Sequence, residues 1–124
     1  MDKTQEQAST EAKIQSSLVQ WYNNTYCLQH HTPRSIIFSI PNGGANKTVA
    51  EHMVNRAMGE YKGASDLVII HKGKLIFVEV KTPTGVQSKD QKIFETHVRQ
   101  CGYDYFLVRS IEDFKNIIHA LECK

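Results

Sequence analysis

The chain has 124 residues, 40% of them hydrophobic and 23% charged, which is the composition of one folded domain with a modest core. Its formal net charge of +2 permits a polyanionic partner without requiring one. No apolar run approaches the ~20 residues that span a bilayer, and the N-terminal segment lacks the apolar stretch of a secretory signal. The three widely spaced cysteines match neither a disulfide framework nor a zinc motif, so we expect a cytoplasmic protein without a membrane partner.

Hydrophobic periodicity and turn residues predict alternating helices and strands along the sequence. Helices are expected over 4–26, 47–58 and 88–102 and after Ser110, and strands over 35–40, 67–70, 75–80 and 103–109. In the second helix, one side carries the residues expected to face the core, namely Ala50, Met53, Val54 and Ala57. The order α-β-α-β-β-α-β-α predicts an α/β fold with a central mixed β-sheet flanked by helices.

The hairpin of the second and third strands places two acids opposite each other. A two-residue turn at 72–73 sets a register in which Asp66 faces Glu79. Opposed residues have Cβ atoms roughly 4.5–5.5 Å apart, so these like charges repel. Lys81 follows Glu79 by two residues and lies on the same face of the sheet. Because the hairpin is otherwise apolar, we expect a sheet buried on both faces that ends in two acids and a lysine.

Two adjacent carboxylates at the end of a buried sheet need compensation. A hard divalent cation can bind both, and oxygen ligands favour magnesium or manganese over zinc. Alternatively, the acids share a proton, or Lys81 forms an ion pair with one of them and has no further function. The residues leave these alternatives open.

Two helices offer further polar groups to this end of the sheet. Glu11 has the helical spacing of Leu18 and Tyr22 and therefore lies on the apolar stripe of its helix. It can equally lie in the first turns of that helix simply because the helix dipole favours acids there. Gln91 completes a capping box with Ser88, and it can also face the acids because its helix follows the loop after the third strand.

These residues belong to a wider pattern along the sequence. Its segments are Glu11, Ile40-Pro41-Asn42-Gly43-Gly44, Gly63-Ala64-Ser65-Asp66-Leu67, Glu79-Val80-Lys81 and Ser88 with Gln91. The pattern resembles the VRR-NUC (virus-type replication-repair nuclease) domain of the PD-(D/E)XK nuclease superfamily, over about residues 6–112. The resemblance implies a restriction-endonuclease-like core, and we expect residues 1–124 to form a single nuclease domain. The sequence departs from the family at Ser65, where proline is usual, and at 45–47, where an arginine is common.

The resemblance also implies a set of metal ligands. Asp66 and Glu79 would bind Mg²⁺ through their carboxylates, with Mn²⁺ able to substitute. The backbone carbonyl of Val80 would add a ligand, and Glu11 would reach the metal directly or through water. No small-molecule cofactor is expected.

For the reaction, the resemblance implies a metal-dependent endodeoxyribonuclease. Lys81 would orient and polarise the attacking water, and Gln91 would help to hold that lysine or the water. Phosphodiester hydrolysis needs a hydroxide at neutral pH and shielding of the charge that develops on the phosphate. A divalent ion and a nearby lysine supply both.

The expected partner is DNA. Several cations are candidates for phosphate contact: Lys47, Arg56, Lys62, Lys89, Lys92 and Arg99. Each can also be a solvated surface charge, and the turn at Asn42 can either bind phosphate through backbone amides or be only a turn. Stand-alone relatives of this length are typical of phages and prophages. The resemblance to them implies a homodimer that cuts four-way (Holliday) junctions in a bacterial or phage-infected cell.

Other functions fit the same residues. One is a nuclease that acts on flaps, ends or single-stranded DNA, and another is a non-catalytic nucleic-acid-binding module with the same fold. A third is a structural domain in which the acids are only an ion-pair cluster. Cleavage assays with magnesium and with EDTA distinguish these alternatives.

Overall fold

The computed structural model of the protein describes residues 3–41 and 48–123. Its elements are α1 (Lys3–Tyr26), β1 (Ile36–Ser39), α2 (Val49–Ala57), β2 (Leu67–His71), β3 (Lys74–Val80), α3 (Lys89–Gln100), β4 (Asp104–Val108) and α4 (Ile111–Glu122). This order confirms the expected α/β succession. The strands form one mixed sheet in the order β1-β2-β3-β4, in which only β3 and β4 run parallel.

The β2–β3 hairpin has the predicted register. Leu67 pairs with Val78 at one end of the ladder, and the turn at the other end consists of two residues. Lys72 and Gly73 have φ values of 47° and 84°, as a type I′ hairpin turn requires. Asp66 and Glu79 therefore follow the last ladder pair side by side.

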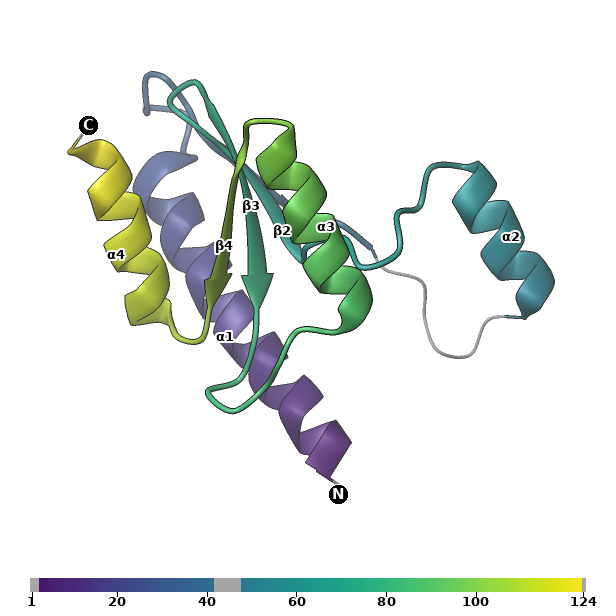
Figure 1. The fold of residues 1–124 in the computed structure, drawn as a ribbon. Coiled ribbons are helices and arrows are strands. Elements are labelled where there is room, and N and C mark those ends of the chain that lie inside the picture. Colours follow the sequence, from purple (N-terminus) through teal and green to yellow (C-terminus); the bar gives the residue numbers. More distant parts are fainter. Residues whose placement is uncertain (1–2, 42–47, 124) are drawn as a thin grey trace.

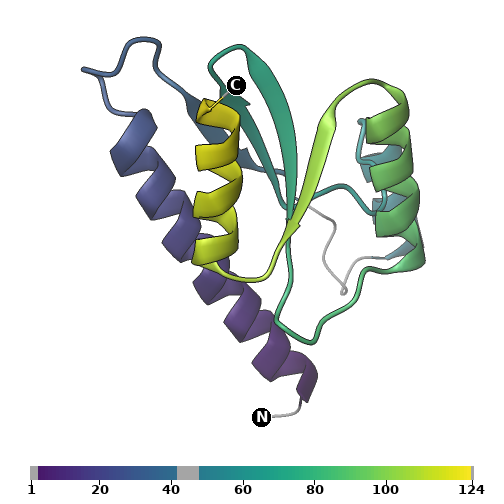
Figure 2. The ribbon, with the colours of Figure 1, turned by 60° about the vertical axis from the view of Figure 1, so that its left-hand side comes forward.

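The helices form two layers around the sheet. Helices α1 and α4 cover one face and α3 covers the other (Figure 2). The larger core lies on the α1/α4 side and includes the fully buried Leu18, Tyr22, Ile69, Ile76 and Phe114. A smaller cluster under α3 joins Ala64, Phe94, Val98 and Tyr105. The sheet is thus anchored mainly from the α1/α4 side.

The expectation that the sheet is buried on both faces is only partly correct on the α3 face, where Val68 is 6% exposed but other apolar residues are open to solvent. Ile36, Phe38 and Ile70, which lie on this face by register, are 50%, 48% and 41% exposed. Helix α3 packs against β4 and the adjoining part of the sheet, while α2 stands away from it (Figure 1). The β1/β2 half of this face therefore has no helical cover within the residues that the structure describes.

Helix α2 also differs from the expectation that its apolar side points inward. None of its residues is buried, and Met53 and Val54 are 67% and 57% exposed; Ala50 and Ala57 are exposed as well. The helix itself forms for local reasons, because the Thr48 side chain accepts a hydrogen bond from the Glu51 amide and caps the first turn. Its amphipathic pattern identified a helix but not a partner for its apolar side.

At the turn end of the hairpin, a buried histidine is fully paired. Tyr22 Oη lies 2.6 Å from His71 Nδ1, and His71 Nε2 lies 2.7 Å from Glu122 Oε1. Burial lowers the pKa of His71, although the neighbouring Glu122 opposes this effect. Among the described helices, none has the length and apolar character needed to cross a membrane, and all three cysteines are unpaired.

Candidate active site

Asp66 and Glu79 lie together where the hairpin ladder ends. The amide of Val80 donates to Asp66 Oδ2 at 2.8 Å, and the amide of Ile40 donates to the Asp66 carbonyl at 2.9 Å. Asp66 is therefore tied to the strands on both sides of it, β1 and β3. The loop after β3 passes beside the N-terminal half of α1, so helix and loop meet at this end of the sheet (Figures 1 and 2).

Glu79 is buried, with only 1% of its surface exposed, and is held from several sides. Gln91 Nε2 donates to its Oε1 at 2.9 Å, Tyr105 Oη donates to its Oε2 at 3.5 Å, and Lys81 Nζ lies 4.0 Å from Oε1. Burial, followed by the nearby Asp66, raises the pKa of Glu79 to about 9. The site thus holds a carboxyl group that needs additional positive charge to ionise fully at neutral pH.

Gln91 fulfils both of the roles that its position suggested. Its Oε1 accepts from the Ser88 amide at 2.8 Å, and its own backbone amide donates to Ser88 Oγ at 3.1 Å, which completes the capping box of α3. Its Nε2 is left to donate to Glu79. Because the two ends of one side-chain amide serve the two contacts, the helix cap also fixes the donor on Glu79.

Glu11 reaches the same place from α1. Its carboxylate interacts with Lys81 and Asp66 and accepts a hydrogen bond from the Thr82 backbone. Burial raises the pKa of Glu11, while Lys81 opposes that rise. Of the two interpretations of Glu11, the structure therefore supports the one in which it faces the sheet.

Several residues around the site were not predicted from the sequence. Tyr105 is 1% exposed, and its hydroxyl contacts both Glu79 and Gln87, whose Nε2 lies 3.2 Å away. In the sequence Tyr105 is one more apolar residue of a strand, and only the parallel pairing of β4 with β3 brings it to Glu79. Arg109 Nη1 donates to the carbonyls of Thr82 and Gly85, both at 2.6 Å, and so holds the loop that follows Lys81.

The segment before Asp66 packs tightly against the start of α3. Gly63 has a φ of +82°, and a Cβ atom there would lie 2.4 Å from the backbone carbonyl carbon and oxygen of Asp90. Ser65 is fully buried and donates to the Leu67 carbonyl at 3.1 Å, so this departure from the usual proline is accommodated by a local hydrogen bond. Because Gly63 packs against the backbone at Asp90, this contact fixes the distance between the segment that carries Asp66 and the helix that carries Gln91.

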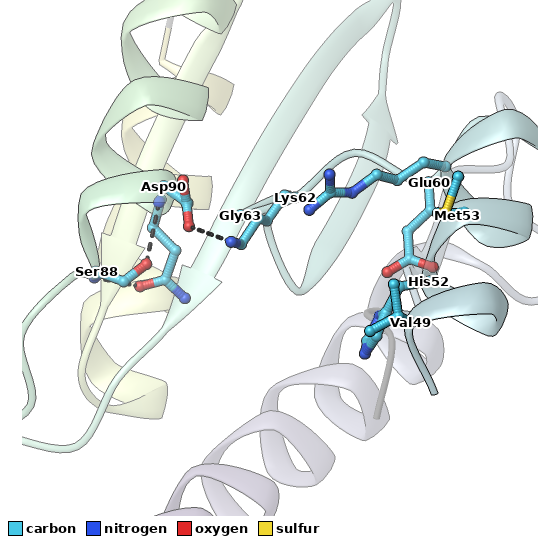
Figure 3. A pocket seen from close by; sticks show the side chains of 10 residues that line it. Val49, His52, Met53, Glu60, Lys62, Gly63, Ser88 and Asp90 are labelled. Atoms are coloured by element: carbon cyan, nitrogen blue, oxygen red, sulfur yellow. Dashed lines mark hydrogen bonds and ion pairs between the residues drawn. The ribbon is translucent and has the colours of Figure 1, made fainter. Parts of the chain in front are cut away.

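The nucleic-acid candidates are only partly placed. Asn42 and Lys47 lie outside the described residues. Arg56 and Lys62 line a hollow of about 530 Å³ between α2 and the start of α3, and Lys62 Nζ lies 3.5 Å from Asp90 Oδ2 (Figure 3). Gln91 lines the same hollow, which therefore adjoins the acids.

The donor set suits a hard divalent cation. Asp66, Glu79 and Glu11 are oxygen donors, and Lys81 supplies one positive charge against the three carboxylates. Within the described residues, no three His, Cys, Asp or Glu side chains form a ready-made metal-binding group. Glu11 therefore does not complete a preformed three-acid site, and the candidate centre is the Asp66–Glu79 pair with Glu11 as a nearby oxygen donor.

A mixed sheet between helices, with an aspartate and a Glu-x-Lys triplet at the end of a hairpin, is consistent with the PD-(D/E)XK class of nucleases. The model of the VRR-NUC domain family matches residues 2–112, so the protein belongs to this family and is a nuclease domain with DNA as its implied substrate. A solved structure described as a VRR_NUC domain protein has the same fold. Its TM-score is 0.69 at 20% identity, over 90% of this chain and 86% of that chain. No curated protein matched the sequence.

Proposed function

We propose that this protein is a Mg²⁺-dependent, structure-selective DNA endonuclease that hydrolyses phosphodiester bonds, and that it cuts four-way junctions as a homodimer. The observation that carries the catalytic part is the buried Glu79 beside Asp66, with Lys81 and Gln91 in contact with it. A pair of acids that repel each other in a buried place destabilises the fold unless a proton or a cation compensates their charge, and such strained pairs are more frequent at functional sites than elsewhere.

Asp66 and Glu79 would hold the cation, with Glu11 and the Val80 carbonyl as further ligands. When bound, the divalent ion lowers the pKa of water and neutralises charge on the phosphate. Gln91 and Tyr105 orient the Glu79 carboxylate through the hydrogen bonds described above. Preoriented ligands of this kind cost no reorganisation during the reaction.

Lys81 would act directly on the reacting groups. Its side chain is 12% exposed, and its Nζ lies 4.0 Å from Glu79 Oε1, beside the acids that would hold the cation. There it can polarise the attacking water and stabilise negative charge on the phosphate oxygens. Arg109 keeps the following loop in place and so limits how far Lys81 can move.

The homodimer rests on the family resemblance and on one surface. Ile36, Phe38 and Ile70 lie exposed on one sheet face, and a second copy of the protein would bury them. A two-fold dimer presents two active sites, which suits a symmetric four-way junction. Sedimentation should give a dimer for the wild type and a monomer for Phe38→Glu. A monomeric wild type would reject this part of the proposal while leaving the chemistry untouched.

Cleavage of labelled four-way junction, flap, linear duplex and single-stranded DNA, with Mg²⁺ and with EDTA, tests the catalytic part. Glu79→Gln and Lys81→Ala should abolish cutting and leave DNA binding largely intact. Glu112→Gln on the exposed start of α4 is the matched control and should cut normally. If Glu79→Gln cut as fast as the wild type, the Asp66–Glu79 pair would not be the catalytic centre. A wild type that binds but cuts none of these DNAs with Mg²⁺ would be a non-catalytic binding module, and preferred cutting of flaps or ends would replace the junction as the substrate.

A further inference from the structure

The hollow between α2 and α3 has no role in the chemistry proposed above. Figure 3 shows Val49, His52 and Met53 on α2, across from Ser88 and Asp90 at the start of α3, with Lys62 between them. Its volume of about 530 Å³ falls within the range of roughly 300–1,000 Å³ that is usual for small-molecule sites. It is therefore large enough for part of a substrate to enter.

The charges that line the hollow do not favour the sugar-phosphate backbone. Arg56 and Lys62 are balanced by Glu60 and Asp90, and Lys62 already pairs with Asp90 at 3.5 Å. A phosphate in this place would meet two carboxylates as well as two cations. Phosphate-binding grooves, in contrast, carry a clear excess of positive charge.

The same lining suits a nucleobase. Val49 and Met53 are 78% and 67% exposed and offer apolar surface to the flat face of a ring. The carboxylates can accept from the amino groups on a base edge, and Arg56 and Lys62 can donate to its carbonyl and ring nitrogen atoms. A neutral group with apolar faces and polar edges matches both parts of the hollow.

The hollow and the catalytic centre share a wall. Gln91 lines the hollow and donates to Glu79 Oε1 at 2.9 Å. A nucleotide whose base lies in the hollow would therefore be within a short distance of the phosphate being cut. A base that is paired and stacked in a duplex cannot enter such a site without first leaving the helix.

We propose that the hollow between α2 and α3 binds one unpaired nucleobase beside the scissile phosphate, so that the enzyme selects DNA whose nucleotide next to the cut is unpaired. This inference rests on the proposed nuclease function and assigns its structure selectivity to residues of this protein. Flaps and frayed ends contain such a base, and a four-way junction supplies one when a base pair next to the branch opens, whereas opening a pair inside a continuous duplex costs more.

The test combines a change in the DNA with a change in the protein. A flap and a junction are made with a single abasic residue, placed in turn at each nucleotide around the branch, since this removes a base but keeps its phosphate. Cleavage is measured for the wild type, and binding is measured with the non-cutting Glu79→Gln variant. At one position beside the cut, the abasic residue should lower kcat/KM and affinity by about tenfold, the order of one stacked base.

Met53→Ala is the matching protein change, and Met58→Ala is its control. Both residues are exposed at or near α2, at 67% and 80%, but only Met53 lines the hollow. Met53→Ala should weaken cutting of the intact substrate by several-fold and have no further effect on the abasic one. Met58→Ala should cut both substrates like the wild type.

Two results would overturn the inference. One is equal cutting of intact and abasic substrates at every position, and the other is equal behaviour of Met53→Ala and Met58→Ala. A uniform loss of binding to all DNA in Arg56→Gln, without dependence on the base, would instead identify the hollow as a backbone site. The first two results presuppose that the wild type cuts DNA, and the Arg56→Gln result is read from binding alone, so all three are distinct from a failure of the nuclease proposal.

Discussion

Gln91 joins the helix cap of α3 to the catalytic acids, and the two contacts can be separated by mutation. Ser88→Ala and Gln91→Ala each remove one half of the capping box, in which the two hydrogen bonds measure 3.1 and 2.8 Å. Each change should lower the free energy of unfolding by about 0.5–2 kcal/mol. Only Gln91→Ala also removes the 2.9 Å hydrogen bond to Glu79.

The loss of that bond should appear in the rate of DNA cleavage. A hydrogen bond to a charged group contributes about 1.5–3 kcal/mol, and about 1.4 kcal/mol corresponds to a tenfold change in rate. Gln91→Ala should therefore cut roughly 10–100 times more slowly than the wild type, whereas Ser88→Ala should cut within about twofold of it. Unfolding in urea and single-turnover cleavage provide the two measurements. Equal loss of activity in both variants would mean that Gln91 acts only through the helix cap.

Two further predictions concern the surrounding fold. Gly63→Ala should lower the free energy of unfolding by about 1–3 kcal/mol, because the added Cβ would overlap the Asp90 backbone. Gly59 also has a positive φ but lies in open space, so Gly59→Ala should lower the free energy of unfolding by less. His71→Gln tests a titration: burial lowers the folded pKa of His71 below 6.5, so protons bind preferentially to the unfolded state. Urea unfolding measures the difference in the free energy of unfolding between the wild type and His71→Gln. This difference should be largest above pH 6.5 and should decrease below it, by at most about 1.4 kcal/mol per pH unit. A constant difference from pH 7.5 to 5.5 would show that His71 keeps its ordinary pKa.

The site could be predicted from the sequence where local rules set the geometry. A two-residue turn at 72–73 leaves one register for the hairpin, and that register alone brings Asp66 beside Glu79. The spacing of Ser88 and Gln91 likewise determines the helix cap. In both places the decisive interactions join residues that are close in the sequence or paired through one short turn.

The parts that were missed depend on distant partners. Tyr105 meets Glu79 only because α3 returns the polypeptide to β3 in a parallel register, and no local pattern specifies that register. The apolar side of α2 shows the same limit, since periodicity predicts a buried side but does not name what buries it. Met53 is 67% exposed in the described structure, although its place in the pattern predicts a buried position.

Glu79 shows most directly how stability and chemistry oppose each other here. Its folded pKa is raised from 4.5 to about 9, mainly by burial. Between pH 4.5 and pH 9, the folded protein therefore either keeps the carboxyl group protonated or is destabilised by its buried charge. In EDTA at pH 8, Glu79→Gln should therefore be more stable than the wild type, on the order of 1–3 kcal/mol. This difference in the free energy of unfolding should increase from pH 5 to pH 8, because the amide of the variant occupies the position of the carboxyl group and does not titrate.

This titration runs opposite to that of His71, so each must be measured as a difference between wild type and variant at each pH. Added Mg²⁺ should raise the melting temperature of the wild type and have little effect on Glu79→Gln, because a ligand stabilises only the form that binds it. The variant that cannot cut should thus be the more stable protein without metal. A Glu79→Gln protein that is less stable than the wild type in EDTA at pH 8 would show that the buried acid serves the fold itself, and the case for a catalytic carboxylate would then lose its physical basis.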